Sequence, residues 1–302
     1  MTGVQTCALP IYSVDAANGL RIMPYERQAG GWTPGKSDNS YGEQVLQLHR
    51  ALYNANVGAD FVFANSADPK QDLARELAQY KLVLIPSLYI ATDAQLQAIS
   101  DYVKNGGHVL MNFKSGFANE NSAVRAQRAP GPLRAAAGFN YQEFSSLEKP
   151  LALKGDPYKL GADNQVATWA EFLQLEHAEA LAYYDHPFFG QWPAITRNHY
   201  GTGELVYEGT HPSDALQSKI VLDCLKSAGL TSADQQLPTA VRVKHGVNRA
   251  GKQLHYYLNY SSSSQTLTYT YAAGKDLLTD GAVAPNQSIV LGPWDVAIVE
   301  EK

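Results

Sequence analysis

The sequence is poor in cysteine and has no long apolar run, and both shortages exclude classes of protein. Only two of its 302 residues are cysteines, Cys7 and Cys224, so we expect neither a disulfide framework nor a thiolate metal cluster. Cys224 lies in a helical pattern and is predicted to be a buried structural thiol. No stretch approaches the roughly 20 apolar residues of a membrane span, so we expect no membrane partner. So little cysteine favours a reducing, cytoplasmic compartment without establishing it.

Basic runs and phosphate-binding motifs are also missing. The 24 Lys and Arg residues against 29 Asp and Glu residues give a formal net charge of −5, which argues against a nucleic-acid partner. Neither a Gly-x-Gly-x-x-Gly turn nor a Gly-x-x-x-x-Gly-Lys-Ser/Thr loop occurs, so no nucleotide cofactor is expected. The eight histidines show no metal-binding spacing, and we therefore expect no metal.

The first eleven residues are predicted to lie outside the native fold. Their sequence, MTGVQTCALPI, equals the translation of a common short-read sequencing adapter in which a GTG start codon is read as Met. We treat residues 1–11 as an artefact, and we expect the rest of the chain to be the tail of a longer protein. Removing them should leave the folded core unchanged, although Cys7–Ile11 is apolar enough to imitate a strand.

Apolar periodicity predicts an α/β domain over residues 12–232. Lys81–Pro86 and His108–Phe113 are short apolar runs typical of buried strands, and Thr92–Gln95 is a capping box that opens the helix between them. Further helices are expected around Val45–Leu52, after Asp68 as N-cap, and from about Ser213 to Ala228. Alternating strands and helices predict a mainly parallel sheet, of the flavodoxin-like or class I amidotransferase-like kind.

The remaining residues predict a second, all-β domain. Residues 231–238 are polar and end in proline, which is typical of a linker. Residues 238–302 are expected to form a small antiparallel β-sandwich. In Leu254–Tyr260 the residues Leu254, Tyr256 and Leu258 share one face, and Ser261–Ser264 is predicted to turn the chain into Leu267–Tyr271.

Catalytic residues are hard to find by motif. An amidotransferase needs a cysteine nucleophile on a tight turn, and the candidate turns here carry serine instead. Ser115 is a possible nucleophile in principle, but it lacks the Gly-x-Ser-x-Gly context. Asp15, Glu120 and Asp185 are acids of the type that glycoside hydrolysis uses in pairs, yet the sequence brings no two of them together, and surface positions are the default.

One segment is more informative. Met111–Arg125, followed by Pro130-Gly-Pro-Leu-Arg134, resembles the stretch after the fourth strand of the trimerisation domain in glycoside hydrolase family 42 β-galactosidases. Other pieces resemble the same family in the same order, over nearly all of residues 12–302: Leu52–Val62, Tyr80–Tyr89, Pro193–Gly203, Asp276–Leu278 and Leu291–Glu300. Each piece alone is weak, but the ordered set is specific.

The resemblance implies a non-catalytic assembly part of a β-galactosidase. In that family the catalytic glutamates, and zinc where present, belong to an N-terminal (β/α)₈ barrel, which would lie before Tyr12 and bind the galactoside. The middle domain of the family resembles an amidotransferase without its nucleophile and holds the barrels in a homotrimer. One departure from the family is the Gly- and Pro-rich insert Gln28–Lys36.

The resemblance and the sheet pattern together single out one loop. Residues 114–125 should leave the carboxyl end of a parallel strand, where open α/β sheets place functional loops. The loop carries five polar residues that we expect to face the sugar cleft or the trimer interface: Lys114, Ser115, Glu120, Asn121 and Arg125. An equally weighted alternative is that Lys114 and Glu120 simply pair and cap the next turn.

Two other functions stay open at this point. One is a stand-alone amidotransferase-like enzyme that uses Ser115 or an unrecognised acid. The other is a carbohydrate-binding module built on the tyrosine-rich β-domain, because tyrosine presents an apolar ring with a polar tip.

Overall fold

A computed structural model describes residues 8–25, 40–64 and 71–302, which form two compact units. The first, called here the α/β unit, reaches to Leu52 and resumes over Ala59–Leu230. The second, the β unit, comprises Tyr53–Gly58 and Thr231–Lys302. Among the described residues, no helix is both long and apolar enough to cross a membrane. The insert Gln28–Lys36 lies outside the described residues.

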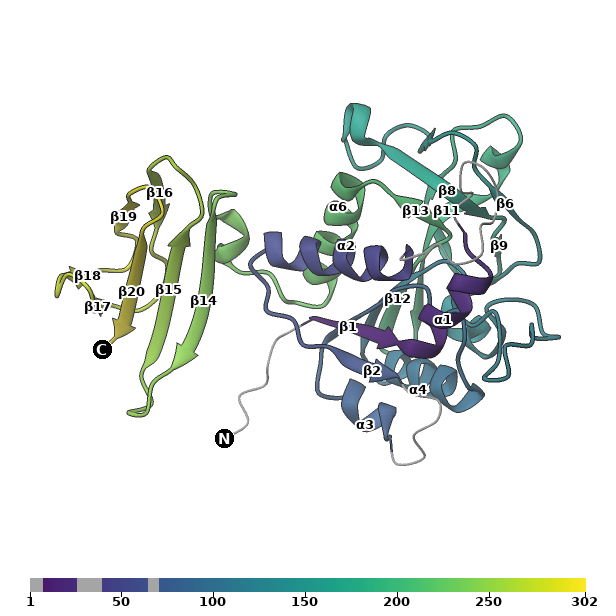
Figure 1. Ribbon diagram of the computed structural model, residues 1–302, viewed down its shortest axis with the longest axis horizontal. Coiled ribbons are helices and arrows are strands. Elements are labelled where there is room, and N and C mark those ends of the chain that lie inside the picture. Colours follow the sequence, from purple (N-terminus) through teal and green to yellow (C-terminus); the bar gives the residue numbers. More distant parts are fainter. Residues whose placement is uncertain (1–7, 26–39, 65–70) are drawn as a thin grey trace. The chain divides into compact units, whose positions relative to one another are not determined.

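A seven-stranded sheet organises the described part of the α/β unit, in the order β10-β11-β12-β4-β3-β1-β2 (Figure 1). The five strands from β2 to β12 pair in parallel, and β11 and β10 add an antiparallel edge. This confirms the predicted α/β class with a mainly parallel sheet. The strands are β1 (Ala8–Ser13), β2 (Val62–Ala64), β3 (Leu82–Ile85), β4 (His108–Asn112), β10 (Glu179–Tyr183), β11 (Pro193–Tyr200) and β12 (Gly203–Glu208).

Strand β1 begins within the first eleven residues, which the sequence predicts to lie outside the native fold. Ala8, Leu9 and Pro10 pair in parallel with Leu82–Leu84 of β3, and the Ile11 side chain is fully buried in the core. Part of the adapter-like segment therefore lies inside the sheet. The physical reason is that a short apolar, extended segment can pair with an open strand edge whatever its origin.

Helices cover both faces of the sheet. In Figure 1, α2 (Ser40–Asn54) and α6 (Asp214–Ser227) lie on one side of β1, and α3 (Leu73–Leu77) and α4 (Asp93–Lys104) lie on the other. The predicted capping box at Thr92 and Gln95 is present at the start of α4. The N-cap of α3 is Asp72, and the expected cap, Asp68, lies outside the described residues. Helix α1 (Val14–Ile22) is not among the helices that the sequence predicts.

The chain makes a long excursion between β4 and β12. It contains the short helix α5 (Arg134–Ala137) and most strands of two small antiparallel sheets, the larger of which is completed by a strand that follows β12. Trp169 and Glu171 lie near the end of β8, in the larger of these sheets. The Glu171 amide donates to Gly209 O at 2.8 Å, and this hydrogen bond holds the end of β8 beside the main sheet. The strands are β5 (Phe139–Asn140) with β9 (Gln174–Leu175), and β6 (Phe144–Ser146), β7 (Leu151–Ala152), β8 (Gln165–Glu171) and β13 (Thr210–Pro212).

The β unit is antiparallel, as predicted, but two details differ. The side chains of β15 that are buried are His255, Tyr257 and Asn259, so the predicted apolar face of Leu254, Tyr256 and Leu258 is the half-buried one. Ser261–Ser264 does not close a hairpin, because β15 pairs with β14 and β20 while β16 pairs with β19. The strands are β14 (Val241–Val247), β15 (Gln253–Asn259), β16 (Gln265–Thr268), β17 (Gly274–Asp276), β18 (Ala282–Val283), β19 (Ser288–Leu291) and β20 (Val296–Glu301).

Candidate functional site

Lys114, the first residue of the predicted loop, is buried where β4 ends. Its backbone has φ +58° and its amide donates to Glu171 Oε1 at 2.7 Å. The ammonium donates to the carbonyl of Met23 at 2.8 Å and lies 5.0 Å and 4.7 Å from the ring centroids of Tyr89 and Trp169. Burial lowers the pKa of Lys114 to about 8, and the nearby Glu171 opposes this shift. The predicted alternative, a Lys114–Glu120 pair, is therefore replaced by contacts with the interior.

The Ser115 side chain stabilises the turn after β4 through two hydrogen bonds. Its hydroxyl donates to Asn112 O at 2.7 Å and accepts the Leu88 amide at 3.0 Å, which joins the ends of β4 and β3. The next residue, Gly116, has φ +69°, and a Cβ there would lie 2.6 Å from Pro130 O. The Ser-Gly dipeptide and the Pro130-Gly-Pro segment thus meet in space. Because the Ser115 proton is used in this turn and the side chain is fully buried, the nucleophile hypothesis loses its support.

Arg125 fastens the far end of the loop. Its guanidinium pairs with Asp93 in the first turn of α4 and donates to the carbonyl of Ala91. Its backbone amide donates to Phe117 O at 3.1 Å. Between these ends lies the loop tip, where Glu120 and Asn121 are exposed and the Asn119 side chain accepts the Asn121 amide at 3.0 Å. Of the five predicted residues, three anchor the loop and two present polar groups to solvent.

Glu171 is the residue that sequence reasoning missed on this side of the sheet. It is fully buried and accepts hydrogen bonds from the Lys114 amide, from Trp169 Nε1 at 3.2 Å and from the Tyr207 hydroxyl at 2.8 Å. Burial raises the pKa of Glu171 to about 7, although these hydrogen bonds favour the ionised form. The sequence contained one signal for this residue: an acid two positions after a tryptophan lies on the same face of a strand as the tryptophan.

A second buried carboxyl, Glu208, lies on the opposite face. It follows Tyr207 in β12, aligns with Asn112 of β4, and accepts Gln217 Nε2 of α6 at 2.7 Å. Within the described residues, its Oε2 atom and both side-chain polar atoms of Asn112 are buried without a hydrogen-bond partner. Burial raises the pKa of Glu208 to about 8. Neither buried carboxyl is accessible to solvent, so neither can reach a substrate in this fold.

A small pocket opens beside the loop. It has a volume of about 170 Å³ and is lined by both ends of the loop together with the segment that follows it, including Gly116, Arg125, Arg128 and Tyr141. Arg128 also donates to Asn140 Oδ1 at 3.3 Å. The carboxyl edge of the sheet therefore combines a rigid loop base, an exposed tip and a shallow polar pocket.

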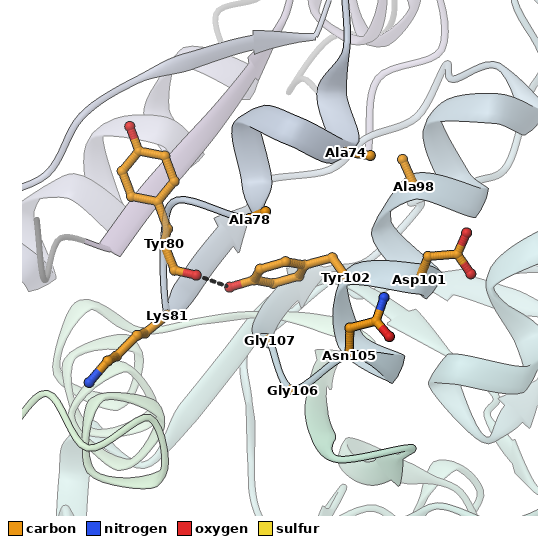
Figure 2. A pocket seen from close by; sticks show the side chains of 10 residues that line it. All are labelled: Ala74, Ala78, Tyr80, Lys81, Ala98, Asp101, Tyr102, Asn105, Gly106 and Gly107. Carbon is orange, nitrogen blue, oxygen red and sulfur yellow. Dashed lines mark hydrogen bonds between the residues drawn. The ribbon is translucent and has the colours of Figure 1, made fainter. Parts of the chain in front are cut away.

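A different pocket, of about 270 Å³, lies at the opposite, amino end of the strands (Figure 2). Alanines of α3 and α4 form its walls, and the Tyr102 hydroxyl points across it to donate to Tyr80 O at 3.0 Å. A Cβ on Gly107 would lie 2.3 Å from the Tyr102 ring, so this glycine is needed for the ring to pack. We interpret this pocket as a product of helix packing, because open α/β sheets bind ligands at the carboxyl ends of their strands.

With this geometry described, the chain can be compared with known proteins. Residues 26–231 match the family described as the β-galactosidase trimerisation domain. A β-galactosidase, LacZ, from Heyndrickxia coagulans is 30% identical over 264 residues, which are 86% of this chain and 37% of that protein. BgaB from a Geobacillus strain is 35% identical over 168 residues, or 56% of this chain and 23% of the relative.

Solved structures agree on the fold. The β-galactosidase from Bacillus circulans sp. alkalophilus superposes with a TM-score of 0.79 at 22% identity, over 99% of this chain and 42% of that one. The β-galactosidase from Halorubrum lacusprofundi gives a TM-score of 0.69 at 24% identity and covers 98% of this chain. The present chain thus spans less than half the length of these relatives.

Proposed function

Because the chain belongs to the β-galactosidase trimerisation-domain family, we propose that it is the non-catalytic assembly portion of a β-galactosidase. The parent enzyme would hydrolyse terminal β-D-galactosides with a (β/α)₈ barrel in the part of its relatives that this chain does not span. The observation that carries the proposal is the family match over residues 26–231 in a chain that spans 37% of its Heyndrickxia coagulans relative.

The finer fold assignment is part of the same proposal. The parallel strands follow the order β2-β1-β3-β4-β12, which is 2-1-3-4-5 in chain order, the order of flavodoxin-like folds. This order supports a flavodoxin-like or amidotransferase-like α/β domain that ends near residue 232, followed by a small β-domain from 238. In the parent, the α/β domain would hold three copies together.

Residues 114–125 are proposed to face the barrel of the parent and its sugar cleft. Two observations support this role: the loop leaves the carboxyl end of β4, and its buried ends hold the exposed Glu120 and Asn121 in fixed positions. A carboxylate and an amide on a rigid support suit hydrogen bonding to sugar hydroxyls or to a neighbouring protein surface.

A chimaera tests the assembly role. The matching region of the Heyndrickxia coagulans enzyme is replaced by this chain, and mass is measured by light scattering while a chromogenic β-galactoside reports turnover. We expect an active trimer, and we expect the chain alone to give the same rate as buffer. A monomeric chimaera, or turnover by the chain alone that an acid-to-alanine change abolishes, contradicts the proposal.

The loop is tested in the same chimaera with Glu120→Ala and Asn121→Ala. Each should leave thermal stability within about 0.5 kcal/mol, because exposed positions rarely contribute more. We expect either a changed KM or kcat, or partial dissociation of the trimer. Asp223→Ala, an exposed acid on α6, serves as the matched control. If both loop variants behave like the control, the loop has no role in the cleft or in assembly.

A further inference from the structure

A chain of titratable side chains crosses the β unit. The two imidazoles of His245 on β14 and His255 on β15 face each other, with their Nδ1 atoms 2.8 Å apart. The other nitrogen of His245 lies 3.0 Å from Asp234 Oδ2, and the other nitrogen of His255 lies 2.9 Å from Glu301 Oε1. Four groups from four separate segments therefore form one continuous chain of polar contacts.

The surroundings of this chain are aromatic, and they bury His255, whereas the His245 side chain is 37% exposed. His255 is 4% exposed, and its ring stacks on the Tyr271 ring with centroids 4.0 Å apart. The Tyr271 hydroxyl donates to Asp234 Oδ2 at 2.7 Å, and the Ser232 hydroxyl lies 3.1 Å from the same oxygen. The other titratable groups that face the cluster are Tyr257 and Tyr269.

The distances fix the number of protons that the cluster holds. Asp234 accepts hydrogen bonds from two hydroxyl groups, so it is ionised and His245 must donate through Nε2. Glu301 and His255 Nε2 share one proton, whichever of them carries it. The two Nδ1 atoms, 2.8 Å apart, also need a proton between them, because two lone pairs at that distance repel. Three protons are required, whereas two neutral imidazoles between two carboxylates supply only two.

We propose that four side chains form a proton-bridged clip: His245, His255, Asp234 and Glu301. The clip holds one proton more than two neutral imidazoles would, and it attaches residues 232–236 to the β-sheet in a pH-dependent way. This segment follows the α/β unit in the sequence and contains Asp234 in the short 3₁₀ helix Ala233–Gln236. Its attachment extends further, because Asn56 Nδ2 donates to Asp234 O at 3.0 Å and Asn56 Oδ1 accepts the Val243 amide at 3.1 Å.

The hydrogen bond between the two imidazoles should break both below and above the pH interval in which the pair holds one added proton. The bridging proton stabilises the clip while it is bound, and this effect is lost as the pH rises through the pKa of the pair. At acid pH a second added proton turns both Nδ1 atoms into donors, which then repel each other. Burial lowers the pKa of His255, against the effect of Glu301, and this supports a pair that carries one positive charge rather than two.

The proton can be observed directly in the unmodified chain. With ¹⁵N-labelled histidine, a hydrogen bond between two imidazole nitrogens gives a through-bond nitrogen–nitrogen correlation in the NMR spectrum. We expect this correlation over one interval of pH in which the chain is folded, and its loss on the acidic and on the alkaline side of that interval. Two rings that both carry their only proton on Nε2 at every pH at which the chain is folded would overturn the proposal. Because this measurement needs no variant, it is decisive even where a substitution prevents folding.

Hydrogen exchange then tests the fastening role. His255→Gln removes the bridge, and we expect amide exchange at Asp234 and Val243 to become about five-fold faster, as for the loss of one net hydrogen bond. The variant should also lose the pH dependence that the wild type shows at these amides. The matched control is His199→Gln, whose side chain is 73% exposed in the α/β unit. Equal exchange and equal pH dependence in all three proteins would show that the pair fastens nothing.

Discussion

The two faces of the sheet at its carboxyl end bury the same chemical group in different ways. Tyr207 and Glu208 are neighbours in β12, so their side chains lie on opposite faces. On the Tyr207 face, Glu171 accepts three donors and lies near the Lys114 cation. On the other face, Glu208 accepts one donor, from Gln217. The pKa is raised to about 7 for Glu171 and to about 8 for Glu208.

This difference shows that burial alone does not set the role of a carboxyl group. Burial raises the pKa of both groups, but the hydrogen-bond donors around Glu171 favour its ionised form. Glu171 therefore acts as an anchor that positions the base of the loop through the Lys114 amide. Glu208 is a neutral acid near pH 7 and serves as a polar packing group between β12 and α6.

The largest effect is expected from removing part of β1, whose Ile11 belongs to the same buried cluster as Trp169 and Tyr207. Deleting residues 1–11 eliminates the pairing of Ala8–Pro10 with β3 and the buried Ile11 side chain. Losing a buried isoleucine alone costs about 2–5 kcal/mol, so the total should exceed that range. Thermal melts of the full chain and of a chain that begins at Tyr12 measure the effect. Superimposable melts would mean that residues 8–11 contribute nothing, as the sequence first predicted.

A second test replaces Glu171, the residue that anchors the base of the loop. Glu171→Ala leaves the Lys114 amide, Trp169 Nε1 and the Tyr207 hydroxyl without their acceptor, and it isolates a buried cation. Each buried donor left without an acceptor costs about 1–3 kcal/mol, and urea unfolding can measure the total. Glu171→Gln keeps one acceptor oxygen and should cost less. If the alanine variant is as stable as the wild type, Glu171 anchors nothing.

The smallest effect is expected on the other face. Glu208→Gln replaces a neutral acid by a neutral amide, so below pH 4.5, where the carboxyl is neutral in both the folded and the unfolded chain, the stability should change by less than about 1 kcal/mol. The folded-state pKa of Glu208, about 8, exceeds the ordinary value of 4.5. Its contribution is therefore complete below pH 4.5 and is lost as the pH rises to about 8. The variant should show a flatter decline over this range, and an unchanged slope would contradict the assignment.

Local signals in the sequence were enough to predict most of the regular structure. The capping box at Thr92 and the apolar runs of β3 and β4 act over a few residues, and each is present where it was expected. Helix α1 and the buried face of β15 were missed, because in both cases tertiary packing decides which of two plausible patterns is realised.

The amino-acid sequence by itself therefore determined the α/β class, the β-rich C-terminal part and the family resemblance carried by Met111–Arg125. Only the tertiary structure decided what the polar residues do. Lys114 and Glu171 are 57 positions apart, and His255 meets Glu301 across 46 positions. Such contacts depend on how strands are ordered in a sheet, and the short-range periodicity of a sequence does not encode that order. The ionisation of these groups follows from burial and partners, which exist only once the chain has folded.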